Sequence, residues 1–308
     1  MHVLAVLAAA VLFGTIGTAK ALGPEGATAL SVGMVRMVLG GIVLAVIAFS
    51  LAVRHARRDP LAARPRLGVR PLLLMVLTGA CLTVFQPLVF LGMERNGVAV
   101  GTVVALGAAP ILAGLIEWAM TRRRPTATWL TATAVATVGV VLLGFGGDAR
   151  SDGGTDPIGL LGSLGAAAAF AVIANAQRRL LDQGWDPFTV VGSMGASGAV
   201  LSAAVLPFVS LTWLGSAAGW ALALWLGIAT IGVAYTLFTW GLSGLTAATA
   251  ATLTLAEPLT ASILGIVVLG ERLSPLAVGG LVVLGFGLAL LAWGSRSPRD
   301  VRPFAVEG

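Results

Sequence analysis

Two stretches of the chain decide its fold: GVAVGTVVALGAAPILAGLIEWAM at residues 97–120 and LTAATAATLTLAEPLTASILGIVV at residues 245–268. Each stretch is apolar over about the 20 residues that a helix needs to cross a membrane. The two stretches align without gaps, so that Pro110 falls on Pro258 after similar runs of small residues. The chain therefore contains two related halves, each built from segments that can span a bilayer.

The composition of the whole chain indicates a lipid environment. Of the 308 residues, 57% are apolar and 10% are charged, and the mean hydropathy is +0.97. A soluble domain of this size would lack the polar side chains to cover its surface. Because backbone groups in lipid must bond internally, the sequence predicts an all-α integral membrane protein with ten transmembrane helices. These helices are expected at residues 3–22, 27–50, 71–93, 98–120, 127–145, 158–177, 187–209, 219–240, 247–269 and 276–293.

The distribution of basic residues over the loops predicts the orientation. The side shared by both termini carries Arg54, Arg57, Arg58, Arg64, Arg66, Arg70, Arg122, Arg123, Arg124, Arg178, Arg179, Arg296, Arg299 and Arg302. The opposite side carries Lys20, Arg95, Arg150 and Arg272. The positive-inside rule therefore predicts a multi-pass protein of the cell membrane with both termini in the cytoplasm. Since these charges are scattered over many loops rather than gathered on one face, nucleic acid is not an expected partner.

The two halves are predicted to insert with opposite orientations. The repeat continues beyond the stretches at residues 97–120 and 245–268, because VGVVLL at residues 138–143 aligns with FGLALL at residues 286–291. An odd number of spans separates the two copies, so the second five-helix repeat is inverted relative to the first. Inverted repeats are typical of secondary transporters, which bind solute near the midplane, although duplication could also build a plain scaffold. The predicted units are residues 1–145, an extracytoplasmic linker at 146–157, residues 158–294 and a cytoplasmic tail at 295–308.

Four features of the sequence carry a family resemblance. They are FGTIGTAKA at residues 13–21, Arg36 within the second span, the small-residue run that ends at Pro110, and LAEPLTASILGIVVLGERLSP at residues 255–275. With these features the chain resembles proteins with two EamA domains in the drug/metabolite transporter superfamily. The resemblance covers nearly the full length, and its most specific part is the last string.

The first half departs from the pattern of the second. Ala109 stands where Glu257 stands in the second copy, and Arg123 stands where Glu271 stands. This chain therefore does not support a mechanism that needs an acid in each half.

Glu257 and Arg36 are the main candidates for a binding site. Glu257 lies about eleven residues into its predicted span, roughly 16 Å deep at 1.5 Å per residue. Because a charge at this depth costs a few kcal/mol, both side chains should face the protein interior and find partners. Glu257 is expected to bind a substrate amine or a coupling proton, and Arg36 could hold a substrate carboxylate. The alternatives are a structural ion pair between them, or capping of backbone groups freed by Pro258.

Neutral polar residues and prolines interrupt other predicted spans. The polar candidates are Gln86, Asn175, Gln177 and Tyr235, which either line the pathway or bond between helices. Pro87, Pro110 and Pro258 each remove a backbone donor, so local kinks or freed carbonyl groups are expected there. Kinks near the midplane suit gating, although membrane helices often tolerate proline without a function.

Other classes of site find little support. The sequence has no phosphate-binding loop, hydrolase elbow or zinc-protease motif, and the single cysteine, Cys81, cannot form an intrachain disulfide. We expect no metal site and no cofactor. The tryptophans near span ends are typical of an interfacial belt; they are Trp118, Trp129, Trp185, Trp213, Trp220, Trp240 and Trp293.

The expected function is secondary transport by alternating access. The family resemblance implies export, or less often uptake, of a small metabolite such as an amino acid, or of a drug-like compound. The substrate gradient or protons would supply the energy, and a homodimer is left open. The alternative is a membrane protein that does not transport: an enzyme acting on lipid-linked substrates, a sensor or an assembly scaffold.

Overall fold

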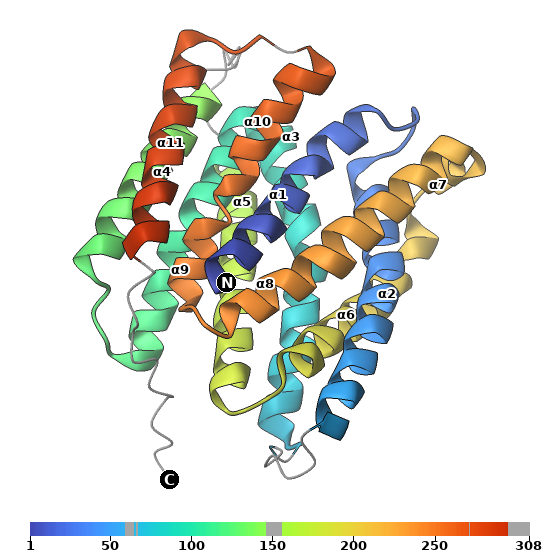
Figure 1. The fold of residues 1–308 in the computed structure, drawn as a ribbon. Helices are drawn as coiled ribbons and strands as arrows, with labels where there is room; N and C mark the ends of the chain where they lie inside the picture. Colours follow the sequence, from blue (N-terminus) through green and yellow to red (C-terminus); the bar gives the residue numbers. More distant parts are fainter. Residues whose placement is uncertain (59–64, 66, 146–155, 271, 295–308) are drawn as a thin grey trace.

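Figure 1 shows a computed structural model that describes residues 1–58, 65, 67–145, 156–270 and 272–294. In this part of the chain the regular structure is helical throughout, and ten helices are long and apolar enough to cross a membrane, which confirms the predicted number. The elements are α1 (His2–Ala21), α2 (Ala29–Arg58), α3 (Val69–Thr121), α4 (Ala127–Phe145), α5 (Pro157–Asp182), α6 (Pro187–Val205), η1 (Leu206–Phe208), η2 (Thr212–Gly215), α7 (Ala217–Leu224), η3 (Trp225–Val233), α8 (Ala234–Leu242), α9 (Ala247–Leu253), α10 (Ala256–Leu269) and α11 (Pro275–Gly294).

Helix α3 contains two spans joined by a tight reversal. Its arms are Val69–Gly97 and Val100–Thr121, and Gly97 has φ 81° and ψ 156° between them. Only glycine adopts this backbone conformation without strain. A β-carbon on Gly101 would lie 2.7 Å from the backbone nitrogen of Met93, so the two arms approach closely beside the reversal.

The ninth span is broken in its middle. Helix α9 ends at Leu253 and α10 begins at Ala256, with Thr254 and Leu255 forming a turn between them. Pro258 lies in the first turn of α10, where its missing N–H removes no bond within the helix. The prolines of α3 differ, because Pro87 and Pro110 lie inside helical arms and the non-helical dihedral angles are at Gly97.

The eighth span changes its winding along its length. It runs from Ala217 to Leu242 as α7, the π-helical segment η3 and α8. A π-helix of this kind is rare and often occurs near functional sites. The apolar pattern of this span did not predict it.

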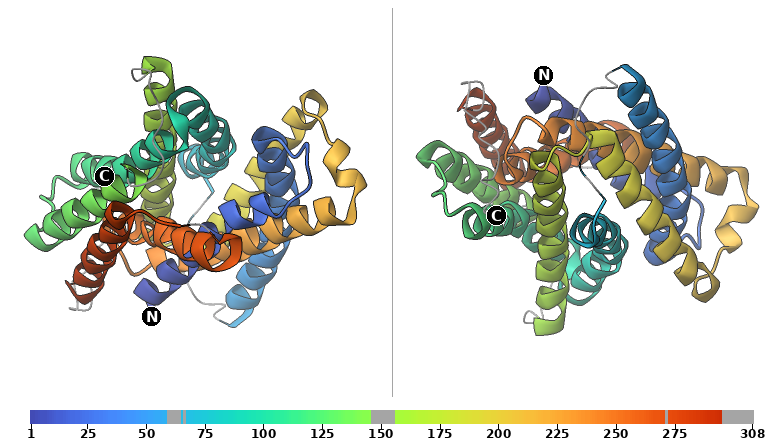
Figure 2. Two further views of the ribbon diagram at one scale, coloured as in Figure 1. Left: turned by 90° about the horizontal axis from the view of Figure 1, so that it is seen from above. Right: turned by 90° about the horizontal axis from the view of Figure 1, so that it is seen from below.

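Helices pair across the two halves. Helix α1 packs on α10, α2 on α6, α3 on α5 and α4 on α11. When each helix is replaced by its equivalent in the other half, α2 with α6 and α4 with α11 give the same pairs again, and α1 with α10 gives α5 with α3. An inverted repeat requires this symmetry. Figures 1 and 2 show α4 and α11 side by side at one edge of the molecule. Glycines permit this contact: a β-carbon on Gly280 would lie 2.5 Å from the backbone nitrogen of Leu143, and one on Gly287 2.6 Å from that of Ala136.

Arg178 is buried, whereas the distribution of basic residues predicted that it lies in a solvated loop. It is 8% exposed, and its Nη1 donates to the carbonyl oxygens of Leu242, Ser243 and Leu245 at 2.8, 2.9 and 3.1 Å. Its Nη2 pairs with Asp182. A guanidinium here satisfies carbonyl groups at the end of α8 that have no partner within the helix.

Two tryptophans of the predicted interfacial belt are buried instead. Trp129 is 7% exposed and donates from Nε1 to Thr252 Oγ1 at 3.1 Å, and Trp213 is 3% exposed and donates to Ser31 Oγ at 3.0 Å. Their indole N–H groups join helices, so for these two the belt prediction was wrong.

Several predicted features fall outside the described residues. They include most of the linker, the tail at 295–308, and Arg64, Arg66, Arg150, Arg296, Arg299, Arg302 and Glu271. The boundaries of the predicted units and the cytoplasmic position of both termini stay predictions.

Candidate functional site

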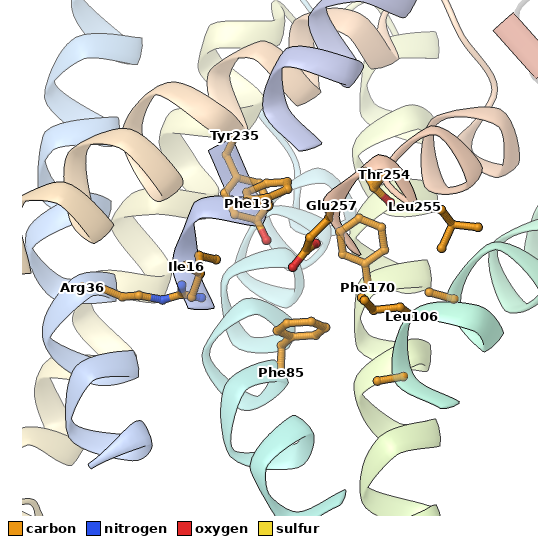
Figure 3. A pocket seen from close by; sticks show the side chains of 12 residues that line it. Phe13, Ile16, Arg36, Phe85, Leu106, Phe170, Tyr235, Thr254, Leu255 and Glu257 are labelled. Atoms are coloured by element: carbon orange, nitrogen blue, oxygen red, sulfur yellow. The ribbon is translucent and has the colours of Figure 1, made fainter. Parts of the chain in front are cut away.

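A cavity lies where helices from both halves meet. The first half contributes residues of α1, α2 and α3, and the second half contributes residues of α5, α8 and the α9–α10 break. Its volume is about 40 Å³, room for a few water molecules. Figure 3 shows Arg36, Tyr235 and Glu257 reaching into it from three different helices. The lining residues are Phe13, Ile16, Arg36, Phe85, Ala105, Leu106, Ala109, Phe170, Tyr235, Thr254, Leu255 and Glu257.

Arg36 is buried with half of its guanidinium free. The residue is 7% exposed, and its Nη2 donates to Gln86 Oε1 at 2.7 Å. Its Nη1 is buried and has no hydrogen-bond partner in the described part of the chain. Gly33, one turn earlier in α2, permits the approach, because a β-carbon there would lie 2.7 Å from Gln86 Cγ. Gln86 therefore holds one side of Arg36, and the other side, at Nη1, has no partner among the described residues.

Glu257 is the second residue of α10, directly after the break. Its backbone N–H donates to the carbonyl oxygen of Thr254 at 2.9 Å, which tightens the turn before the helix. Among the described residues no hydrogen bond or ion pair engages its carboxylate, and the ion pairs found there are His55 with Asp186, Arg95 with Asp156, and Arg178 with Asp182. The structural ion pair between Arg36 and Glu257 is therefore not formed.

The α9 segment that carries this break is held at two points. Glu117 Oε2 accepts a hydrogen bond at 2.8 Å from the backbone nitrogen of Ala248, in the first turn of α9. An acidic group is favourable at this end of a helix. Thr252 Oγ1, near the other end, contacts Trp129 Nε1 and lies 3.0 Å from Thr133 Oγ1 of α4. These contacts fix the position from which Glu257 enters the cavity.

Aromatic rings form much of the remaining wall. Phe13 and Tyr235 have ring centroids 5.1 Å apart, and Phe85 and Phe170 have centroids 6.3 Å apart. Phe238, which is fully buried, lies 5.7 Å from Phe170 and 6.3 Å from Tyr235. Distances of this size are favourable for aromatic pairs. The sequence pattern did not predict this wall, although Phe13 opens the FGTIGTAKA motif.

The predicted polar residues divide into two groups. Arg36, Tyr235 and Glu257 line the cavity, and Gln86 contacts Arg36. Asn175 lies elsewhere: its side chain donates to the carbonyl oxygens of Ala113 and Ala171 at 3.1 and 2.9 Å. It therefore joins α5 to α3 as an interhelical bond. Gln177 has a similar place, since it accepts from Thr239 Oγ1 at 3.0 Å.

Charge and shape together describe what the cavity can bind. A guanidinium with a free Nη1, a phenol and a carboxylate share one small, largely aromatic space. Buried charges are costly without partners, so a ligand that supplies opposite charges is stabilised there. In the described part of the chain no group of His, Cys, Asp and Glu could hold a metal ion.

Comparisons with known proteins add the following findings. The sequence pattern of the EamA-like transporter family matches residues 1–145 and 157–293. The uncharacterized transporter YwfM of Bacillus subtilis (strain 168) is 35% identical over 299 residues, which cover 97% of this chain and 95% of the relative. A solved crystal structure, described only as that of a protein, matches with a TM-score of 0.74 and 21% sequence identity. The match covers 96% of this chain and 97% of the chain in that structure. At that identity, the likeness concerns the fold alone.

Proposed function

This chain belongs to the EamA-like transporter family, and we propose on that premise that it is a secondary transporter of a small metabolite. It is a multi-pass membrane protein with ten spans, and we propose that it works by alternating access. The solute is an amino acid or a drug-like compound, and the direction is export across the cell membrane.

One observation carries this proposal: the cavity between the halves holds two opposite charges, and neither forms an ion pair with another described residue. Arg36 Nη1 has no partner in the described part of the chain, and the carboxylate of Glu257 lies in the same cavity without an ion pair. A structural pair would bring these charges together, because a buried charge without a partner is costly. Keeping both charges available suits a site that binds and releases a solute.

Glu257 is also the proposed carrier of a coupling proton. Its carboxylate is the acidic group that lines the cavity, and it stands at the break of a span. If the proton binds from one side of the membrane and leaves to the other, its gradient drives the solute.

Reconstitution in liposomes tests the proposal. The purified chain should move at least one solute of a labelled metabolite panel faster than empty liposomes do. Replacing Glu257 by Gln removes the proton site, so accumulation driven by a pH gradient should vanish while solute exchange survives. Glu94→Gln is the matched control, because Glu94 is an exposed acid of α3 that does not line the cavity.

Two results would count against the proposal. Turnover of a lipid without flux of any solute would support a membrane enzyme instead. Undiminished accumulation by Glu257→Gln under a pH gradient would remove the proton-carrying role while leaving transport intact.

A further inference from the structure

Positions 109 and 257 face the same cavity from the two halves of the chain. In the alignment of the repeats Ala109 falls on Glu257, and a proline follows each of them. Both residues line the cavity. The repeat therefore offers two equivalent places for an acid, and this chain fills one.

We propose that the alanine at position 109 determines the net charge of the solute, so that the cavity accepts solutes whose charges sum to zero. This inference rests on the proposed function and names its substrate class: a compound with one anionic and one cationic group. Position 109 is thus a specificity-determining position.

Two charged residues, Arg36 and Glu257, line the cavity, and they have opposite signs. In a conformation whose cavity is wider than the about 40 Å³ described above, an anionic group at Arg36 Nη1 and a cationic group at Glu257 would satisfy both. A solute with a single charge leaves the other protein charge buried without a partner, which lowers affinity.

Ala109 lies in the wall of the same cavity. Its side chain is 5% exposed and shares this wall with Ala105 and Leu106 of the same arm of α3. A glutamate at position 109 would bring a second carboxylate to this wall. The cavity would then carry one negative charge in excess, and a cationic solute would balance it.

A set of three solutes with one carbon skeleton tests the charge rule. Leucine is net neutral, leucinamide is cationic and 4-methylpentanoate is anionic near pH 7. Each is titrated against purified protein in detergent, and the rise in unfolding temperature gives an apparent dissociation constant. The wild-type chain should bind leucine best. In Ala109→Glu the preference should move toward leucinamide by about tenfold or more, and in Glu257→Gln it should move toward 4-methylpentanoate.

Two controls separate charge from size. Ala109→Gln adds the bulk of glutamate without its charge and should keep the wild-type order of affinities. The exchange Ala109→Glu/Glu257→Ala keeps one acid at the cavity and should also keep that order. Should Ala109→Glu fail to fold, Arg36→Gln also leaves an excess of negative charge and should shift the preference toward leucinamide.

The outcomes distinguish this inference from the proposed function. If the variants show the expected orders of affinity but liposomes show no leucine counterflow, the proposed transport function is overturned and the charge rule stands. Counterflow with an order of affinities that Ala109→Glu and Arg36→Gln do not change would overturn the charge rule alone. No stabilisation of any variant by any of the three solutes would overturn it as well.

Discussion

Span 4 (Val100–Thr121) and span 9 (Ala247–Leu269) carry the same proline at the same place in the repeat, yet they have different structures. Span 4 stays helical through Pro110, whereas span 9 breaks at a turn just before Glu257 and Pro258. Proline removes one backbone bond in either case. Neighbouring side chains therefore decide whether the helix opens.

Hydroxyl groups distinguish the two spans. In span 9, Thr254 Oγ1 donates to the carbonyl oxygen of Ala251 at 2.7 Å, and Thr252 Oγ1 donates to that of Ala248 at 3.0 Å. The equivalent residues of span 4 are Leu106 and Val104, which have no hydroxyl. Threonine side chains can replace backbone partners that an opened turn loses inside lipid. One half has thus kept an open, charged turn, and the other keeps a closed, apolar one.

The largest expected effect comes from making span 9 like span 4. Thr252→Val/Thr254→Leu removes both hydroxyls and leaves Trp129 Nε1 without its acceptor, at a cost of about 1–3 kcal/mol in the free energy of unfolding. Glu257 would leave its position, and solute flux in liposomes should fall by roughly tenfold or more.

The change Val104→Thr in span 4 is the control for this prediction. It adds a hydroxyl where α3 is continuous, at a residue that does not line the cavity, and should leave flux within about threefold of wild type. Normal flux in the span 9 variant would show that the threonines do not hold the break.

A smaller effect is expected where α1 packs on the broken span. A β-carbon on Gly14 would lie 2.7 Å from the carbonyl oxygen of Glu257 and 2.6 Å from Thr260 Cβ. Gly14→Ala should therefore destabilise the protein by about 1–3 kcal/mol, measured by thermal unfolding in detergent. Gly17→Ala, one turn further along α1, meets nothing within 4 Å and should stabilise by about 0.5–1 kcal/mol. Equal unfolding temperatures for the two variants would contradict this account of the contact.

The smallest effect concerns the prolines themselves. Pro110→Ala restores a backbone donor inside a continuous helix, so the variant should gain about 1 kcal/mol in the free energy of unfolding. Pro258→Ala should change it by less than about 0.5 kcal/mol, because the first turn of α10 lacks that bond in any case. The unfolding temperatures of the two variants, measured in the same detergent, compare their stabilities. A larger loss of stability in Pro110→Ala than in Pro258→Ala would contradict this prediction.

Hydropathy and the repeat predicted the coarse fold and the family. The ten spans were predictable because length and apolar composition fix them, and the string around Glu257 carried the resemblance that the family match confirms. The break in span 9 was read as a proline kink, since the sequence does not show which hydroxyl meets which carbonyl. Arg178 was counted as a loop charge because its three carbonyl acceptors belong to a turn more than sixty residues away.

The lining of the cavity was predictable only where a charged or polar side chain stood inside a span. Arg36 and Glu257 were singled out because a charged side chain inside a membrane span is costly and therefore needs a partner or a function. The aromatic wall was not found, because Phe85 and Phe170 look like any other apolar residue of a membrane helix until their helices are placed together. Asn175 resembled Tyr235 in sequence context, yet one bonds between helices and the other lines the cavity.

The pairing of helices across the halves has a consequence for biosynthesis. Helix α4 closes the first repeat, but its tight contact is with α11, where Gly139 meets the backbone of Leu284, more than a hundred residues later in the chain. Contacts between residues so distant in sequence form late and slowly. During translation α4 must wait in the bilayer, with its glycine face against lipid, until α11 leaves the ribosome.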